Sequence, residues 1–260
     1  MRIAMIGCGT IGQAFIHHVR AVDATIGVAG VLVREPAKYA GAGCPVVTDL
    51  DELLALRPDW IVECAGQAAF ASLVPRLLRA GNNVLAISSG ALADAALHAE
   101  IESAARQGDV QLCIPAGALA GIDALAGARH VGLTAVRYVR TAQPATWVRA
   151  GALQEDAARA LTAPRTVYEG CAREAARRFP KNANVTATLA LAGIGFERTR
   201  VQLIADPAAT GNTHAIEAEG AFGTLRTSLN TAVIPGTRTS RIVAGSLAHA
   251  LVSRVARIAI

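Results

Sequence analysis

Three glycines near the start of the chain have the spacing of a nucleotide-binding turn. Gly7, Gly9 and Gly12 form G-x-G-x-x-G in "IGCGTIG", directly after a short apolar run and before a segment with helical periodicity. The first glycine permits a tight bend, the second lets the backbone approach a pyrophosphate, and the third lets the helix pack closely. The motif predicts a dinucleotide site at the positive end of that helix, with Thr10 and Ile11 among its contacts. The alternative is a glycine-rich turn without a ligand.

The end of the second predicted strand bears on which dinucleotide is bound. NAD-specific enzymes usually carry an acidic residue there, about 20 residues beyond the glycines, to hold the ribose 2′-hydroxyl. This chain reads "VLVREP", with Arg34 near that position and Glu35 after it. Because a guanidinium can bind a 2′-phosphate, the sequence predicts NAD or NADP as cofactor. The alternative for Arg34 is a solvated surface residue.

Polar residues follow two further apolar runs. Glu63 and Cys64 in "VECAG", and Ser88 and Ser89 in "ISSG", lie where predicted strands end. Open α/β sheets bind ligands at the carboxyl ends of their strands, so we expect Glu63, Cys64, the adjacent Ala65 and Ser88 to line the cofactor site. The alternatives are a buried thiol for Cys64, for which no activating partner is visible, and a helix cap for Ser89.

The second half of the chain contains two ambiguous polar segments. In "FPKNANVTATLALAGIG", Asn182 and Asn184 precede a long apolar helix, and local physics favours capping over hydrogen bonding to a carboxamide or carboxylate. His214 begins an apolar/polar alternation in "GNTHAIEAEG". Its reference pKa, about 6.5, suits proton transfer near neutral pH, but a lone histidine at a strand start is more often structural.

The periodicity of the chain changes near its middle. Up to Pro115, short apolar runs alternate with helical patterns, which predicts an α/β fold with a Rossmann-type, doubly wound parallel sheet. Beyond it, longer alternating runs surround two helical patterns, which predicts an α+β domain with a mainly antiparallel sheet covered by helices on one face. These runs are "TAVRYVRTA", "RTRVQLIAD" and "HAIEAEGAFGTLRTSLN", the last over residues 214–230. We therefore expect a dinucleotide-binding domain over 1–115, an α+β domain over 116–235, and a helix over 239–256 that packs back on the first domain.

The composition restricts the class of protein and its partners. A chain of 260 residues with 52% hydrophobic and 17% charged residues is typical of a globular protein. The net charge is +5, but the arginines are scattered and no basic run is interleaved with aromatics, so we expect no nucleic-acid partner. No apolar stretch has the length of a membrane span. Five dispersed cysteines without a CxxC pair indicate reduced thiols in the cytoplasm, and neither they nor the adjacent His17 and His18 indicate a metal site.

Taken together, the chain resembles the L-aspartate dehydrogenase family. The resemblance covers nearly the whole chain, in the family's order and at similar spacing, through "IGCGTIG", "VECAG", "ISSGALAD", "PAGALAGIDAL", "FPKNANVTATLALAGIGFERTRVQLIADP" and "GNTHAIEAEGAFG". It implies a dinucleotide-binding domain followed by an α+β domain that supplies the catalytic surface and a homodimer interface. It also implies that His214 is catalytic and that Ala118 and Asn184 contact the cofactor.

The activity implied by the resemblance is NAD(P)-dependent deamination of L-aspartate to oxaloacetate and ammonia, or the reverse amination. The substrate would then be a small dicarboxylic amino acid. Two alternatives stay open: a dehydrogenase or imine reductase that acts on another small 2-amino or 2-oxo acid, and a dinucleotide-binding sensor without catalysis.

Two departures from the family concern the substrate. The family usually has Arg-Lys-Pro where this chain reads "RTAQPATW", with Gln143 before Pro144, and Asn-Pro-Lys-Thr-Ser where it reads "IPGTRTS". A guanidinium binds a carboxylate through two N–H groups in one plane, whereas a lysine ammonium acts as a point charge. We therefore expect at least one substrate carboxylate to be bound differently from the way the family usually binds it. The candidate substrate-binding residues are Lys181, Asn182, Arg140 and Arg238.

Overall fold

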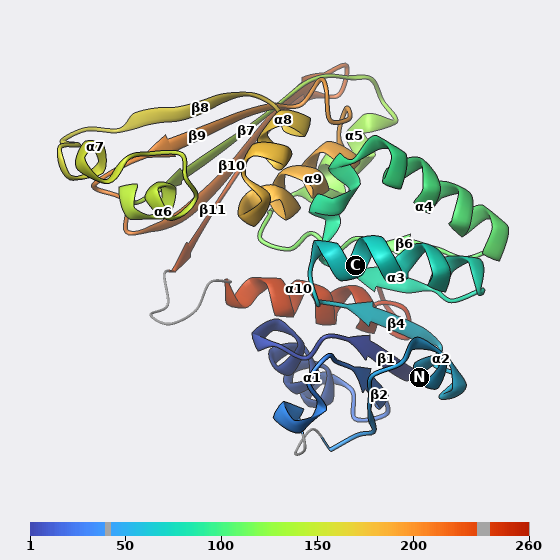
Figure 1. Cartoon of the computed structure of the whole chain (residues 1–260). Helices are drawn as coiled ribbons and strands as arrows, with labels where there is room; N and C mark the ends of the chain where they lie inside the picture. The colour runs from blue at the N-terminus through green and yellow to red at the C-terminus, as the bar shows by residue number, and fades with distance from the viewer. Residues whose placement is uncertain (40–42, 233–239, 260) are drawn as a thin grey trace. The chain divides into compact units, whose positions relative to one another are not determined.

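The computed structural model describes residues 1–39, 43–232 and 240–259. These residues form two compact units, Met1–Gly117 together with Arg241–Ile260, and Ala118–Ser240 (Figure 1). Within the described ranges, no helix has the length and apolar content needed to cross a bilayer. Arg238, a predicted substrate-binding residue, lies outside the described residues.

A six-stranded parallel sheet forms the centre of the first unit. Its strand order is β3-β2-β1-β4-β5-β6, so the order reverses between β1 and β4. This is the doubly wound arrangement that the sequence predicted, and its ligand position lies outside the carboxyl ends of the strands at the reversal. The strands are β1 (Arg2–Ile6), β2 (Gly27–Leu32), β3 (Val46–Val47), β4 (Trp60–Glu63), β5 (Val84–Ala86) and β6 (Leu112–Cys113).

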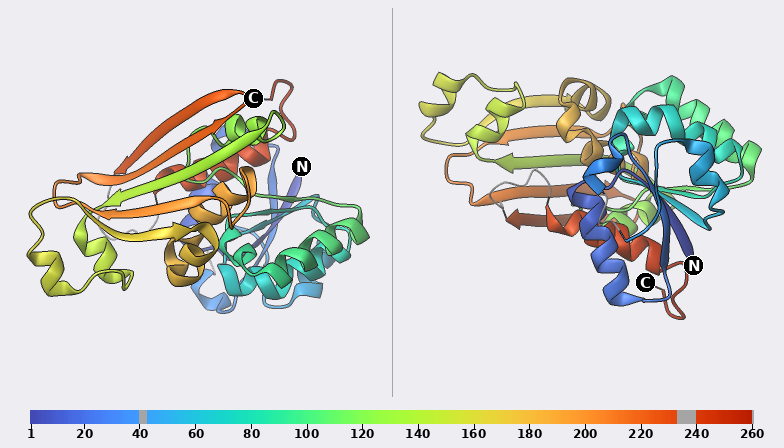
Figure 2. Two further views of the ribbon diagram at one scale, coloured as in Figure 1. Left: turned by 90° about the horizontal axis from the view of Figure 1, so that it is seen from above. Right: turned by 60° about the horizontal axis from the view of Figure 1, so that its bottom comes forward.

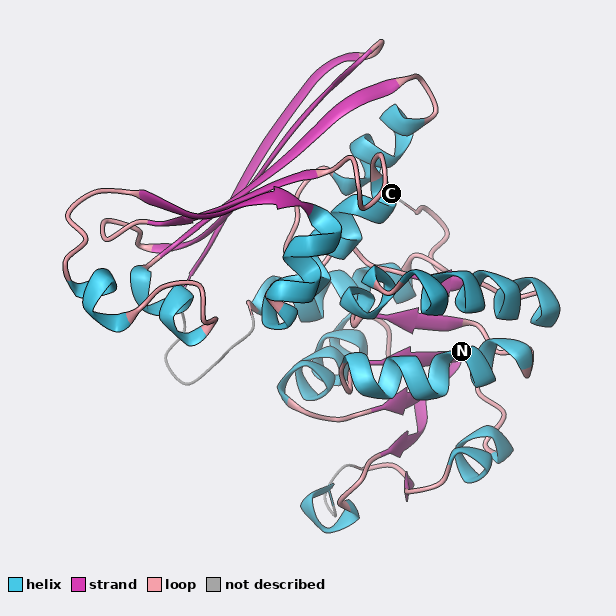
Figure 3. Cartoon of the chain, turned by 45° about the horizontal axis from the view of Figure 1, so that its top comes forward, coloured by secondary structure: helices cyan, strands magenta, loops and turns pink. Residues whose placement is uncertain are grey.

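Helices flank this sheet on both sides (Figure 3). The chain runs from β1 to β2 towards one edge of the sheet, and from β4 through β5 to β6 towards the other. Because these crossovers are right-handed, α1 lies on one face of the sheet and α3 and α4 lie on the other. The last helix, α10, packs beside α1, and its buried Leu247 and Leu251 share a core with Phe15 and Val19 of α1. The helices are α1 (Thr10–Val22), α2 (Leu50–Ala55), α3 (Gln67–Arg79), α4 (Ala95–Gly108) and α10 (Arg241–Val252), with the 3₁₀ turns η1 (Pro36–Tyr39) and η2 (Ser89–Ala93).

The second unit is built on a five-stranded sheet with the order β11-β10-β7-β9-β8 (Figure 2). The β7–β9 pair is parallel and the other three pairs are antiparallel. The elements are α5 (Ile122–Arg129), β7 (Leu133–Ala142), α6 (Pro144–Arg149), α7 (Glu155–Arg159), β8 (Arg165–Cys171), α8 (Ala172–Arg178), η3 (Pro180–Asn182), α9 (Ala183–Ala192), β9 (Arg200–Ala205), β10 (Gly211–Gly220) and β11 (Gly223–Ala232).

The two faces of this sheet differ in polarity. Tyr138 of β7 and its cross-strand partner Ile216 of β10 are both buried, as expected for residues that alternate onto the core face. The next pair, Arg137 and Glu217, lies on the opposite face and forms an ion pair of 3.2 Å. The prediction of an α+β unit with one covered sheet face is therefore confirmed.

Candidate active site

The glycine turn of the first unit fits a dinucleotide pyrophosphate. Gly7 has φ +84°, and a Cβ added to it would lie 2.8 Å from Ala65, so only glycine fits there. A Cβ at Gly12 would lie 3.1 Å from the Gly7 carbonyl, whereas one at Gly9 would meet no described atom within 4 Å. Helix α1 has no side-chain cap and no acidic residue in its first turn. The turn therefore leaves the backbone at Gly9 open beside the positive end of a helix.

Glu63 does not line a ligand site, contrary to the sequence-based expectation. Its side chain is fully buried at the end of β4. Its carboxylate accepts from the backbone N–H of Ala65 at 2.8 Å and of Gly66 at 2.9 Å, and from the Ser88 hydroxyl at 2.9 Å. The Ser88 N–H adds a bond of 3.3 Å. Burial raises the pKa of Glu63, while these hydrogen bonds act in the opposite direction. Glu63 thus connects, through hydrogen bonds, the loop that follows β4 with the loop that follows β5, and so positions Ala65 and Ser88.

Cys64 is a structural thiol in this unit. Its Sγ donates to the Gly7 carbonyl at 3.2 Å. Burial, followed by the nearby charge of Glu63, raises the pKa of the thiol, so a reactive thiolate is disfavoured. The capping interpretation of Ser89 is wrong, because Ser89 is the first residue of η2 and the preceding Ser88 stands at the cap position without using its side chain there.

Arg34 lies two residues beyond the end of β2 and is exposed. Its side chain makes no hydrogen bond or ion pair with any described residue, and the neighbouring Glu35 pairs with Lys38 at 2.8 Å. The guanidinium is therefore available to a 2′-phosphate. The role of Arg34 in cofactor choice stays a prediction.

His214 is buried in the second unit, at 5% exposure, on a strand with a neighbour on either side. It lies on β10, directly opposite Arg140 of β7 and Leu229 of β11. Its Nδ1 is 2.7 Å from the Tyr138 hydroxyl oxygen. Burial, assisted by the positive charge of Arg140, lowers the pKa of His214 to about 3. The expectation that His214 titrates near neutrality is therefore wrong for the free protein, because the buried imidazole is neutral there.

Arg140 links two polar side chains beside His214 and lies over an aromatic ring. One Nη donates to Asn182 Oδ1 and the other donates to Asn212 Oδ1 at 3.2 Å. Its guanidinium carbon lies 5.2 Å from the centroid of the buried Trp147 ring. Burial lowers the pKa of Arg140, but an arginine side chain stays charged in proteins. The result is a fixed positive charge directly across from a neutral imidazole.

Two buried donors of this cluster have no acceptor among the described residues. They are Nε of Arg140 and Nδ2 of Asn182. The amide orientation of Asn182 is set by chemistry, because a guanidinium requires an oxygen acceptor. A buried donor without an acceptor costs roughly 1–3 kcal/mol. The pair is therefore suited to an anionic ligand that supplies oxygen acceptors.

Asn182 does not cap α9, although local physics favoured that role. It occupies the N-cap position, but its side chain makes no capping hydrogen bond because Oδ1 accepts from Arg140. Asn184 lies half-buried in the first turn of α9. Lys181 is exposed and donates to the Arg149 carbonyl at 3.4 Å, so it does not join the Arg140 cluster. Ala118 is buried at the start of the second unit.

Tyr138 and Asn212 belong to this cluster but were not predicted from the sequence. A signal for both was present, since residues two apart on a strand share a face. In "RYVR" Tyr138 shares a face with Arg140, and in "NTH" Asn212 shares a face with His214. Which strands become neighbours in the sheet is a tertiary property, so the sequence alone did not bring these pairs together.

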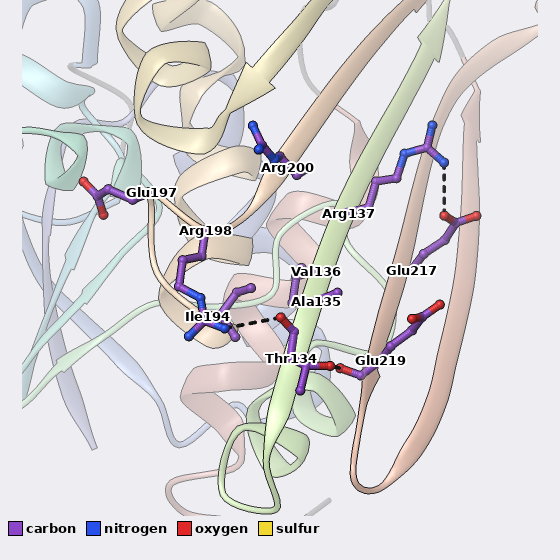
Figure 4. Close-up of a pocket in the computed structure, with 10 residues that line it drawn as sticks. All are labelled: Thr134, Ala135, Val136, Arg137, Ile194, Glu197, Arg198, Arg200, Glu217 and Glu219. Carbon is purple, nitrogen blue, oxygen red and sulfur yellow. Dashed lines mark hydrogen bonds and ion pairs between the residues drawn. The ribbon is translucent and has the colours of Figure 1, made fainter.

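A separate hollow of about 560 Å³ lies on the opposite, polar face of the same sheet (Figure 4). It is lined by charged side chains that include Arg137 and Glu217, which pair with each other. At its end, Arg198 donates to the Thr134 carbonyl at 3.3 Å. Because Arg137 alternates with Tyr138 along β7, this hollow faces away from the His214 cluster.

A nucleotide-binding unit of the doubly wound type, followed by an α+β unit with a buried imidazole and guanidinium, defines a class of NAD(P)-dependent oxidoreductases. A family model described as "Aspartate dehydrogenase, C-terminal" matches residues 123–254, and one described as "Homoserine dehydrogenase, NAD binding domain" matches residues 7–115. The chain belongs to the aspartate dehydrogenase family, and its first unit binds NAD or NADP.

Individual relatives agree with this assignment. L-aspartate dehydrogenase 1 from Bordetella pertussis is 43% identical over 251 residues, which cover 96% of this chain and 95% of the relative. L-aspartate dehydrogenase from Ruegeria pomeroyi is 42% identical over 259 residues, with 99% and 94% covered. The crystal structure of aspartate dehydrogenase from Thermotoga maritima, 23% identical, superposes with a TM-score of 0.81 over 100% of this chain and 99% of that one, and so shares its fold.

Proposed function

We propose that the protein is an NAD(P)-dependent L-aspartate dehydrogenase, which interconverts L-aspartate with oxaloacetate and ammonia. The observation that carries the proposal is the cluster in which buried His214 faces Arg140, with donors on Arg140 and Asn182 that find no acceptor in the described part of the chain. A neutral imidazole beside a fixed cation suits a substrate whose reacting carbon bears a carboxylate. The identities above 40% to two L-aspartate dehydrogenases over nearly full length support the same substrate.

The residues of the first unit bind and orient the cofactor. The turn of Gly7, Gly9, Thr10, Ile11 and Gly12 takes the pyrophosphate. Arg34 takes the adenosine ribose end, and Cys64, Ala65 and Ser88 border the carboxyl edge of the sheet. From the second unit, Ala118 and Asn184 are proposed as further cofactor contacts. When bound, the cofactor exchanges a hydride with C2 of the substrate.

The residues of the second unit bind the substrate and handle its protons. Arg140 and Asn182 donate to a carboxylate, with Lys181 and Arg238 as candidates for the other carboxylate. Interconversion of iminium and ketone through a carbinolamine requires protons to move between water, oxygen and nitrogen at C2. His214 is the group proposed to assist these transfers. We further propose that the enzyme is a cytoplasmic homodimer.

The substrate assignment is tested by steady-state kinetics. We expect kcat/KM for L-aspartate to exceed that for L-alanine, L-glutamate and L-asparagine by at least about tenfold, or about 1.4 kcal/mol of transition-state discrimination. Alanine in particular would leave a cation without its carboxylate. Turnover without this preference would refute aspartate as the substrate. Absence of turnover with every amino acid, and with 2-oxo acids plus ammonia, would favour the sensor.

The role of His214 is tested by its replacement. His214→Ala is expected to lower kcat by roughly 10²- to 10⁴-fold while NADH still binds, because general acid–base assistance contributes about that factor. His130→Ala, which removes an exposed imidazole in the same unit, is the matched control and should retain wild-type kcat. A kcat of His214→Ala equal to that of the wild type would refute the catalytic role and indicate that His214 is a structural residue.

A further inference from the structure

The hydroxyl of Tyr138 lies within hydrogen-bond distance of one ring nitrogen of His214. Tyr138 is 1% exposed and lies on β7, where its cross-strand partner is Ile216, two residues beyond His214. The diagonal neighbours meet with the hydroxyl oxygen 2.7 Å from Nδ1. The two rings are inclined by only 15°, with centroids 6.1 Å apart. The ring planes are thus nearly parallel, and the hydroxyl oxygen lies within hydrogen-bond distance of Nδ1.

The direction of proton donation follows from what else surrounds the hydroxyl. Burial raises the pKa of Tyr138, so the phenol keeps its proton. Among the described residues, Nδ1 of His214 is the hydrogen-bond partner of this hydroxyl. If Nδ1 carried a proton and donated it, the phenolic proton would be left buried without an acceptor. Donation from Tyr138 to Nδ1 satisfies both groups.

We propose that Tyr138 is a positioning residue that holds neutral His214 in the tautomer with its proton on Nε2. The inference rests on the proposed function for its catalytic consequence. With Nδ1 occupied by Tyr138, the resting imidazole presents an N–H donor to the substrate, so its part in the proposed proton transfers begins with donation from Nε2.

This tautomer matches the other groups of the cluster. Arg140 Nε and Asn182 Nδ2 are donors too, so the cluster offers donors to an oxygen-rich anion. In the amination direction, the Nε2–H of His214 donates to the 2-oxo oxygen and polarises the carbonyl for attack by ammonia. By microscopic reversibility, the same Nε2–H donates to the oxygen at C2 as deamination forms the ketone.

The tautomer is measured on the free, full-length protein labelled with ¹⁵N-histidine. Long-range ¹H–¹⁵N spectra distinguish a protonated from an unprotonated ring nitrogen, and the His214 signals are those lost in His214→Gln. We expect Nε2 to be protonated and Nδ1 to be a hydrogen-bonded acceptor in the wild type. Tyr138→Phe should shift the Nδ1 resonance towards that of an acceptor without a hydrogen bond. A wild-type spectrum with the proton on Nδ1 would overturn the proposal, and this outcome needs no variant.

The catalytic consequence is measured by kinetics with oxaloacetate and ammonia. Tyr138→Phe is expected to lower kcat by about 2- to 13-fold, the factor that corresponds to one neutral hydrogen bond, with NADH affinity retained. Tyr168→Phe is the matched control, because it also removes a buried hydroxyl from the same sheet, one that donates to the Cys171 carbonyl at 3.2 Å. Tyr168→Phe should change neither kcat nor the His214 resonances.

The two readouts separate this inference from the proposed function. The spectra involve no substrate, so they report the tautomer even if oxaloacetate is not turned over. A Tyr138→Phe variant with wild-type Nδ1 resonance and wild-type kcat would refute the positioning role. A wild-type protein with the expected tautomer but no turnover would instead refute the proposed activity.

Discussion

The burial of His214 makes the stability of the second unit depend on pH in a predictable direction. The folded protein holds this imidazole at a pKa of about 3, against 6.5 for an exposed histidine. Between these two values the unfolded chain binds a proton that the folded chain does not bind. Protonation of His214 in the unfolded chain therefore leaves the free energy of unfolding unchanged above about pH 6.5, and lowers it progressively as the pH falls towards 3.

The size of the effect follows from linkage. One pKa unit corresponds to about 1.36 kcal/mol, and about pH 5.0 lies about 1.5 units below the unfolded pKa, so His214 should cost the unit about 2 kcal/mol there. At about pH 7.5 the same group should cost less than about 0.1 kcal/mol. Because pH 5 lies well above the folded pKa, the predicted loss depends mainly on the pKa of the unfolded chain.

The assay compares urea unfolding at these two pH values in wild type and His214→Gln. Trp147 is fully buried in the second unit, so its fluorescence in a Trp60→Phe background reports the unfolding of that unit. The wild type should lose about 2 kcal/mol more than His214→Gln on going from the higher to the lower pH. His130→Gln, an exposed histidine of the same unit, should behave as the wild type does. Equal losses in wild type and His214→Gln would refute the assignment of His214 as a buried neutral imidazole.

Three further substitutions test the two proposed binding sites. Arg140→Lys should lower kcat/KM for L-aspartate by roughly 10- to 150-fold, the range for one charge-assisted hydrogen bond, and a loss below about threefold would exclude Arg140 from carboxylate binding. Arg34→Ala should weaken NADP binding about tenfold more than NAD binding in calorimetric titrations, because only NADP carries the 2′-phosphate, and equal losses would assign Arg34 to the solvated surface. Glu63→Gln replaces the oxygen that accepts from the Ser88 N–H with an NH2 group, which cannot accept, so the loop after β5 should shift and NADH binding should weaken about 5- to 10-fold in fluorescence titrations. Unchanged NADH affinity would refute the positioning role of Glu63.

The fold was largely predictable because its core strands carry strong periodic signals. The buried runs of β1, β4 and β5 and the alternation along β7 and β9 all appeared as strands in the sequence. Strand β8 was missed because Tyr168 is its one fully buried residue, which leaves little alternation to detect. The segment 214–230 was predicted as one alternating run, but it forms parts of two strands joined at a turn, where Gly223 has φ +108°.

The candidate site was less predictable because its residues act through tertiary neighbours. The glycine turn is local, so its residues followed from the motif. Asn182 has the local features of a helix cap, and only the approach of Arg140 shows why its side chain is used elsewhere. The pKa of His214 depends on burial and on Arg140, neither of which the sequence displays. The division into a cofactor domain and a catalytic domain stays a prediction.

The polar cluster also bears on the missing family lysine. Gln143, which stands where the family usually has that lysine, donates to the Ala209 carbonyl at 3.0 Å and occupies the N-cap position of α6. The nearest strand therefore supplies its positive charge from Arg140, three residues earlier and on the core face beside His214. Holding a guanidinium there requires acceptors, and Asn182 and Asn212 satisfy its two Nη groups without neutralising its charge. Carboxylates as acceptors would have neutralised the guanidinium. The two amides leave its positive charge for an anionic ligand, together with Nε, which has no acceptor among the residues that the structure describes.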